Sequence, residues 1–267
     1  MNKDRILALD FDGVLWDSAQ ENWVTGYITY FKYSDKLACT RKNNKKFLQG
    51  RYLARSGEDF YYLFRMLDEN PDIDFRKITP EKWKEYKKKH EIAAEPFVRE
   101  FYKTRKCLLQ YDHKGWAMHQ QPYPGIINDI KGLEKYFKHI YITSAKDTPS
   151  IKKLIKSRRI KFKVIGREHS THKHEQLKYL KDKHGIKYEN IYFIDDCMEN
   201  LTPLLNTKVN IFLAGWGYNS AEDKIEAKKL GIPVVNLKDL TQKIKHLINK
   251  EKKQAKVKTK IIKINKF

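Results

Sequence analysis

Residues 6–15 read Ile-Leu-Ala-Leu-Asp-Phe-Asp-Gly-Val-Leu, and this stretch decides the fold. The apolar run before Asp10 predicts a short buried strand that ends at this carboxylate. Asp12 follows two residues later, and Gly13 permits a sharp backbone turn. Two carboxylates this close repel each other and lose hydration, so packing does not explain them. We therefore expect a site that handles phosphate through a cation.

The composition adds a strongly basic charge to this expectation. The 267 residues allow one core with a smaller accessory domain, and they carry a net charge of +22. Such a charge attracts anions, from small phosphates to nucleic acid or an acidic membrane face. Scattered lysines that reflect only a lysine-rich composition would give the same total. Residues 250–267 form a basic tail with eight Lys and one Glu.

The cysteines and the apolar segments favour a cytoplasmic protein. Cys39, Cys107 and Cys197 form no CxxC pair and no disulfide framework. The first apolar run is interrupted by Asp10 and Asp12, which is unlike a signal peptide. No apolar stretch approaches the length needed to span a membrane.

Two kinds of pattern divide the chain. Residues 17–121 show helical periodicity over 18–33, 44–69 and 80–110, with a break expected at Pro96. After residue 122, predicted strands alternate with predicted helices. The strands are 139–143, 161–165, 190–195, 208–213 and 233–236, and the helices are 125–138, 147–158, 171–184, 198–206, 220–230 and 238–249.

This alternation predicts an α/β fold with a doubly wound, Rossmann-like parallel sheet. The sheet would be formed by residues 1–16 and 122–249, with a mostly helical domain of residues 17–121 inserted after the first strand. Sheets of this kind bind ligands beyond the carboxyl ends of their strands, where the strand order reverses.

Polar residues follow several of the predicted strands at this edge. Asp10 and Asp12 follow the first, Thr143-Ser144 ends the next, and Asp195-Asp196 ends the 190–195 strand. Lys173 opens the helix before that last strand. Carboxylate oxygens suit a hard cation such as Mg²⁺, so these residues predict a magnesium site.

The chain resembles the haloacid dehalogenase superfamily in four motifs, in the same order: Asp10-Phe11-Asp12-Gly13-Val14-Leu15, Tyr141-Ile142-Thr143-Ser144, Lys173, and Phe193-Ile194-Asp195-Asp196. The resemblance covers about residues 3–15 and 122–240. Residues 122–125 (PYPG) and 215–218 (GWGY) are similar to the phosphoglycolate phosphatase-like branch. The insertion stands where members of that branch carry a C1 cap.

The resemblance implies a role for each motif residue. Asp10 would be the nucleophile that forms an aspartyl-phosphate, and Asp12 would be the general acid and then the base. Thr143 and the backbone N–H of Ser144 would bind phosphoryl oxygens, and Lys173 would neutralise charge. Mg²⁺ would bind Asp10, the Asp12 carbonyl and Asp196, with Asp195 close by.

Two features depart from the family pattern or leave alternatives open. Asn200 stands where many members have a further Asp after motif IV, so we expect weaker or retuned metal binding, and not its loss. Lys163 and Lys178 compete with Lys173 for the third motif.

Some motif residues also have simpler interpretations. Thr143 could be a helix N-cap, and the Asp pairs could be turn or cap residues.

Arg51 and Arg55 are the candidate substrate residues of the insertion, since we expect them one helical turn apart, where both could bind a second anion. An ordinary solvated face is the alternative interpretation.

Three functions follow from these patterns. The first is a Mg²⁺-dependent phosphatase of a small phosphorylated metabolite. The others are a phosphatase of nucleotide or nucleic-acid ends, and a non-catalytic phosphate-binding protein on the same fold. The oligomeric state is not readable from the sequence.

Overall fold

The computed structural model describes residues 4–250, apart from the side chains of residues 92 and 93. Only the first residue of the basic tail, Lys250, falls inside this range. Among the described residues, no helix is both long enough and apolar enough to cross a bilayer.

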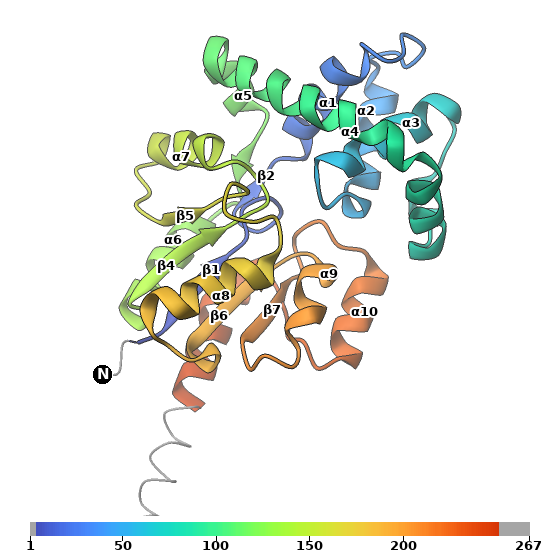
Figure 1. Ribbon diagram of the computed structural model, residues 1–267. Coiled ribbons are helices and arrows are strands. Elements are labelled where there is room, and N and C mark those ends of the chain that lie inside the picture. Colours follow the sequence, from blue (N-terminus) through green and yellow to red (C-terminus); the bar gives the residue numbers. More distant parts are fainter. Residues whose placement is uncertain (1–3, 251–267) are drawn as a thin grey trace, which may run out of the picture.

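A six-stranded parallel sheet forms the centre of the larger part (Figure 1). Its strand order is β5-β4-β1-β6-β7-β8, so the chain adds strands to one side of β1 and then to the other. The strands are β1 (Ile6–Leu9), β4 (His139–Thr143), β5 (Lys163–Ile165), β6 (Ile191–Asp195), β7 (Asn210–Ala214) and β8 (Val234–Val235). The predicted doubly wound α/β fold is therefore confirmed, and the order reverses at β1.

Helices cover both faces of this sheet. One face carries α6 (Ile126–Lys131), α7 (Thr148–Ser157) and a closing helix over 240–250, and the other carries α8 (Lys173–His184), α9 (Met198–Leu201) and α10 (Ala221–Lys229). The side chains of β1 alternate between the two layers: Leu7 and Leu9 enter the first core, and Ile6 and Ala8 the second. Because all four are buried, the strand has no polar face until Asp10.

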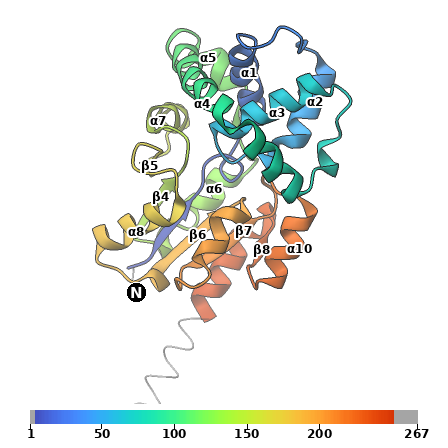
Figure 2. The same cartoon turned by 45° about the vertical axis from the view of Figure 1, so that its right-hand side comes forward.

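The helical insertion follows β1 and precedes β4 in the sequence, and in space it covers the carboxyl edge of the sheet (Figures 1 and 2). Its helices are α1 (Ala19–Tyr30), α2 (Arg41–Gly50), α3 (Gly57–Glu69), α4 (Pro80–Tyr111) and α5 (His113–Met118). The first four enclose a separate hydrophobic cluster rich in aromatic rings, whereas Trp116 of α5 packs into the core under the sheet. The chain leaves the sheet through β2 (Trp16–Asp17) and returns through β3 (Gln121–Pro122), and these two segments pair antiparallel.

Two expectations for the insertion are wrong. The predicted helix 44–69 is two helices, because α2 ends at Gly50 and Ser56 begins α3 with a capping box to Asp59. The predicted break at Pro96 is absent, and α4 continues as one helix through it. The buried Phe97 and Phe101 next to Pro96 anchor this helix in the aromatic cluster, which offsets the missing N–H donor.

Two helices of the sheet layers are shorter than predicted. α6 ends at Lys131, and a 3₁₀ turn over Glu134–Tyr136 replaces its second half. α9 is a single turn that continues as a 3₁₀ turn over Thr202–Leu204.

Candidate active site

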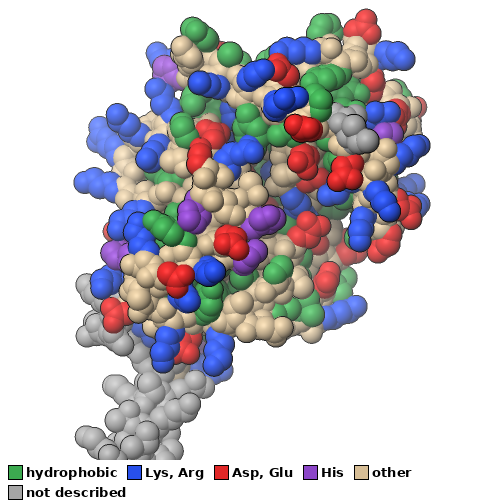
Figure 3. Space-filling view, viewed as in Figure 1, with side chains coloured by type: hydrophobic (Ala, Val, Ile, Leu, Met, Phe, Trp, Pro, Cys, Tyr) green, Lys and Arg blue, Asp and Glu red, His purple; other side chains and the backbone are tan. Residues whose placement is uncertain are grey.

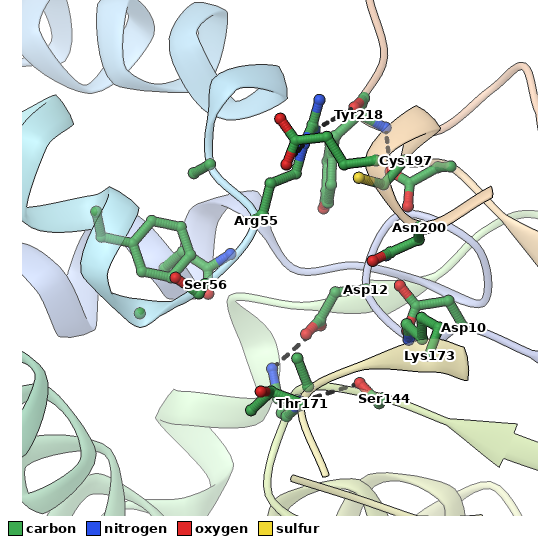
Figure 4. Close-up of a pocket in the computed structure, with 18 of the residues that line it drawn as sticks. Asp10, Asp12, Arg55, Ser56, Ser144, Thr171, Lys173, Cys197, Asn200 and Tyr218 are labelled. Atoms are coloured by element: carbon green, nitrogen blue, oxygen red, sulfur yellow. Dashed lines mark hydrogen bonds and ion pairs between the residues drawn. The ribbon is translucent and has the colours of Figure 1, made fainter. Parts of the chain in front are cut away.

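A cavity of about 320 Å³ lies between the carboxyl edge of the sheet and the helical insertion. The sheet side contributes Asp10, Asp12, Ser144, Lys146, Lys173, Asp196 and Asn200, and the insertion contributes Asn22, Arg51, Arg55, Ser56, Tyr102 and Arg105. Figure 4 shows Arg55 and Ser56 on the side opposite Asp10 and Lys173. A volume of this size suits a small molecule.

Asp10 and Lys173 form a buried ion pair at the floor of the cavity. Lys173, the first residue of α8, donates from Nζ to Asp10 Oδ1 and to the Thr143 carbonyl, both at 2.7 Å. Burial raises the pKa of Asp10 to about 8 against the opposing charge of Lys173, with Asp195 and Asp196 adding to the rise. Lys163 and Lys178 are exposed, so Lys173 is the lysine at Asp10.

Asp10, Asp195 and Asp196 together suit a divalent cation. One carboxylate oxygen from each lies within 4.8 Å of the others, and all three residues are buried. Burial and the neighbouring Asp195 raise the pKa of Asp196 to about 7. A cluster of buried carboxylates that repel each other is expensive without a cation, and hard oxygen donors are those that Mg²⁺ prefers. The residues therefore fit a magnesium ion.

Two glycines let the backbone approach Asp196 closely. Gly13 has a φ of +84°, and a Cβ there would lie 2.0 Å from Asp196 Oδ2. A Cβ on Gly217 would lie 2.3 Å from the Asp196 Cβ. The N–H of Tyr218 donates to Asp196 Oδ2, which fixes the carboxylate in this narrow space. The Asp12-Gly13 turn and the 215–218 loop thus need glycine for steric reasons.

Asp12 points away from the carboxylate cluster. Its Oδ1 accepts a hydrogen bond from Lys146 Nζ at 3.2 Å, and its side chain is not one of the three clustered carboxylates. The expectation that Asp12 serves a metal therefore concerns its carbonyl alone and stays a prediction. Figure 4 shows Asp12 between Asp10 and the insertion side of the cavity.

Behind Asp12 lies a buried network that joins the sheet to the insertion. Lys146 Nζ also donates to Glu21 Oε2 of α1 at 3.4 Å and to Gln120 Oε1 at 3.2 Å. Glu21 accepts two further bonds, at 2.8 Å each, from the Arg105 guanidinium of α4. Although burial opposes it, the charges of Arg105 and Lys146 hold the pKa of Glu21 well below its usual range.

One of the expected phosphate contacts is wrong. The N–H of Ser144 donates to the Ile165 carbonyl at 3.0 Å, so it continues the sheet and is not free for a phosphoryl oxygen. The Ser144 side chain does line the cavity, and its Oγ accepts from the Lys146 N–H. Thr143 is fully buried, and its hydroxyl lies 3.5 Å from the Leu9 carbonyl, which it faces as a weak donor.

Asn200 holds Asp195 in place. Its Nδ2 lies 3.2 Å and 3.1 Å from the two oxygens of Asp195, and the Cys197 N–H donates to Oδ1 of the same carboxylate. An Asp at position 200 could not make these donations and would repel Asp195. The departure from the family motif therefore supplies a donor to the acidic cluster.

Arg51 and Arg55 both reach the cavity, although they are not on one helical turn. Arg51 belongs to the 3₁₀ turn Arg51–Leu53, and Arg55 to the loop before α3. The Arg51 guanidinium lies 4.2 Å from the centre of the Tyr218 ring and 5.2 Å from that of Phe60, and it donates to the Ala54 carbonyl. Nearby acidic groups raise the pKa of Arg55 against the effect of burial, so it is cationic at any ordinary pH.

Three residues to which the sequence assigned no role in the site complete it: Lys146, Glu21 and Tyr218, the last of the GWGY motif. The sequence signal for Lys146 was its position, three residues after Thr143 of the second motif. Glu21 meets it only through the tertiary fold. The Tyr218 hydroxyl accepts from the N–H groups of Ser18 and Ala19 at the start of α1, so it links the 215–218 loop to the insertion.

Sequence comparisons give no relative for this chain. Neither the protein-family models nor the curated protein sequences contain a match.

Solved structures do resemble it. A haloacid dehalogenase-like family hydrolase from Streptococcus pneumoniae matches with a TM-score of 0.57 at 18% identity, covering 88% of this chain and 95% of that one. A predicted phosphatase from Clostridium acetobutylicum matches with a TM-score of 0.61 at 17% identity, covering 91% and 99%.

A third structure carries a more specific name. A predicted phosphoglycolate phosphatase from Haemophilus somnus matches with a TM-score of 0.60 at 14% identity, covering 91% and 98%. In each case nearly the whole of the solved chain is covered, so the insertion and the sheet are both included. The protein has the fold of the haloacid dehalogenase-like hydrolases.

Proposed function

We propose that this protein is a magnesium-dependent phosphatase that hydrolyses a small phosphorylated metabolite through an aspartyl-phosphate. The observation that carries the proposal is the Asp10–Lys173 pair beside Asp196, with Asp12 next to them, all facing one small cavity. The fold shared with hydrolases and phosphatases supports the same reading.

The reaction follows from the positions of these groups. Asp10 attacks the phosphorus atom, and the bond to the leaving oxygen breaks as Asp12 gives that oxygen a proton. Asp12, now ionised, takes a proton from a water molecule that attacks the aspartyl-phosphate. Inorganic phosphate leaves, and Asp10 is restored.

Asp10, Asp195 and Asp196 would hold the magnesium ion. When bound, it supplies positive charge that keeps these acids ionised and offsets charge on the phosphoryl group. Lys173 adds a fixed cation beside Asp10. The helical insertion acts as a cap that excludes water and selects the leaving group.

Arg51 and Arg55 favour a substrate with a second anionic group. Both line the cavity from the insertion, and the contact that Arg55 makes with an acid is a long one, 3.9 Å from Nε to Glu199 Oε2. A carboxylate or second phosphate on the substrate would pair with these two guanidinium groups.

The direct test is phosphate release from a panel of phosphorylated metabolites with Mg²⁺. We expect turnover of one class of small phosphoester, loss of all turnover in Asp10→Asn, and normal turnover in the control Asp35→Asn at the surface. A wild-type protein that binds phosphate esters but releases no phosphate from any of them would favour the non-catalytic alternative.

The role of Arg55 gives a second prediction. Arg55→Ala should raise KM about 10-fold or more for the best substrate with a second anion, the effect expected for one charged hydrogen bond. The KM for 4-nitrophenyl phosphate, which has no second anion, should change little. Equal effects on both substrates would contradict an anion-binding role.

A further inference from the structure

Lys146 is a buried cation that the proposed chemistry does not use. It lies in the loop after β4, and its side chain is 1% exposed. Its ammonium donates to Asp12 of the sheet, Glu21 of α1 and Gln120 of the segment that returns from the insertion. An ammonium has three donors, so these contacts account for all of its hydrogen-bonding capacity.

The charges around Lys146 alternate and balance. Arg105, Glu21, Lys146 and Asp12 form a row of cation, anion, cation and anion, and the first three are almost completely buried. Glu21 is held on its other side by the hydroxyl of Thr25 and the indole N–H of Trp116. Glu21 is therefore fixed within the insertion, and Lys146 is fixed by Glu21.

The contact with Lys146 leaves one oxygen of Asp12 for chemistry. Lys146 engages Oδ1, and no hydrogen bond within residues 4–250 engages Oδ2. The Asp12 side chain is 19% exposed and lines the cavity. Holding Oδ1 restricts rotation of the carboxyl group and leaves Oδ2 as the oxygen available to a ligand in the cavity.

We propose that Lys146 is the positioning residue for the acid/base Asp12, and that Glu21 of the insertion anchors Lys146 for this task. The proposal rests on the proposed phosphatase function. Because Glu21 belongs to the insertion and contacts Lys146, the orientation of Asp12 depends on the contact between the insertion and the sheet.

The test uses the fact that a general acid matters most for a poor leaving group. The readout is kcat/KM with Mg²⁺ for a series of aryl phosphates, from 4-nitrophenyl phosphate to phenyl phosphate. This parameter reports the steps up to release of the phenol. In Lys146→Met we expect a loss of about 10-fold or more on phenyl phosphate and of less than about 3-fold on 4-nitrophenyl phosphate.

Three further variants sharpen the result. Lys146→Arg retains a cation and should recover part of the activity on phenyl phosphate. Glu21→Asp keeps the charge but shortens the anchor, so its loss should also be larger on phenyl phosphate. Lys243→Met removes a comparable lysine, which donates to the Val234 carbonyl far from the cavity, and should leave the leaving-group dependence unchanged.

Different outcomes overturn different statements. An equal loss on all aryl phosphates in Lys146→Met, or no loss, would show that Lys146 does not position Asp12. A wild-type leaving-group dependence in Glu21→Asp would remove the anchoring role of Glu21. If the wild-type protein hydrolyses no phosphoester at all, the proposed function fails and this inference fails with it.

Discussion

Asp196 shows how a candidate metal ligand can destabilise the protein that carries it. It is buried, lies beside Asp195, and is surrounded closely by Gly13 and Gly217. Its pKa of about 7 exceeds the usual value for Asp, so the folded state binds the proton more tightly than the unfolded state. Stability from this group is therefore present at low pH and is lost as the pH rises from about 4 through 7.

Asp196→Asn should stabilise the metal-free protein at pH 8. If the relief of repulsion is about 1 kcal/mol, Tm rises by about 2–4 °C for a chain of this size. The gain should vanish at pH 5, where Asp196 is protonated. Thermal unfolding at both pH values, without and with Mg²⁺, checks this, with Asp35→Asn as the control.

Magnesium should stabilise the wild-type protein and have much less effect on Asp196→Asn. The same stabilisation in both proteins would contradict a role for Asp196 in metal binding. A lower Tm in metal-free Asp196→Asn at pH 8 would contradict the repulsion argument.

His139 and His184 form a second titrating pair. His139 begins β4, His184 ends α8, and neither lines the cavity. Their ring centres lie 4.4 Å apart, and His184 Nε2 lies 2.9 Å from the Tyr141 hydroxyl. Partial burial is the main cause that lowers the pKa of both. The charges of Lys138, Lys163 and Lys183 lower it further, and His139 adds to the effect on His184. Folding therefore disfavours their protonation.

His184→Gln should reduce the loss of stability on acidification. A lowered pKa in the folded state means that stability is complete above the usual His pKa of 6.5 and is lost as the pH falls below it. The difference in Tm between pH 7.5 and pH 5 should be smaller in His184→Gln than in the wild type. The exposed His174→Gln is the control, and an equal acid response in all three proteins would contradict the argument.

At the scale of elements, the contact between α1 and α3 depends on a glycine. Gly26 of α1 is buried, and a Cβ there would lie 2.3 Å from Cε2 of the fully buried Phe64. Phe64 in turn stacks on Trp23 and contacts Phe47, so it has little freedom to move. Helix propensity alone would favour alanine at this position by about 1 kcal/mol.

Gly26→Ala should therefore destabilise the protein in spite of the better helix former. Overpacking of this kind costs about 1–3 kcal/mol. Denaturant unfolding should show a lower midpoint, and Phe64→Leu in the same chain should recover part of the loss by making room. An increase in stability in Gly26→Ala would mean that propensity outweighs packing here.

The elements that the sequence predicted best are those with a simple hydrophobic pattern. β1, β4 and β6 are mainly apolar runs in the middle of a sheet. β1 ends directly before Asp10, as expected, and β4 and β6 lie within one residue of the predicted bounds. The predicted helix 44–69 failed because its break depends on the Ser56–Asp59 capping box, which a periodic pattern does not show. Pro96 misled because long-range aromatic packing decided whether α4 continues.

The same contrast applies to the site. Asp10, Lys173, Asp195 and Asp196 could be placed together because each stands at a strand end or at the helix before it. The donors and acceptors that surround them could not, since the Ser144 N–H is used by the sheet and Lys146 meets Glu21 across 125 positions. Contacts of this kind depend on the insertion and the sheet folding together.

At the scale of the whole molecule, acidic residues accompany the basic ones in some segments and not in others. The stretch 151–163 carries seven Lys or Arg residues and no acid, and Figure 3 shows dense basic side chains at the edge where α7 lies in Figure 1. All seven are exposed, and none makes an ion pair within the described range. α10, in contrast, contains three acids, Glu222, Asp223 and Glu226, beside its lysines.

We expect the 151–163 stretch to bind polyanions weakly without contributing to turnover. Association with a single-stranded oligonucleotide should weaken steeply with salt, by about 0.7 log units per neutralised phosphate for each tenfold rise. Replacing Lys152, Lys153 and Lys156 with Gln should reduce the affinity and the salt slope. The same change at Lys224, Lys228 and Lys229 should do so much less, because α10 also carries three acids that offset their charge.

Turnover of the small phosphoester then tests whether the basic charge takes part in substrate binding. If the substrate is a small metabolite enclosed under the insertion, kcat/KM should be the same in both triple variants and the wild type, since α7 lies outside the cavity. If phosphate release from oligonucleotide ends is faster than from small esters and falls in the α7 variant alone, the nucleic-acid alternative gains the support that net charge could not give it. An affinity that does not change with salt would contradict polyanion binding by this stretch. Each lysine that pairs with a phosphate releases counterions, so true binding must weaken as the salt concentration rises.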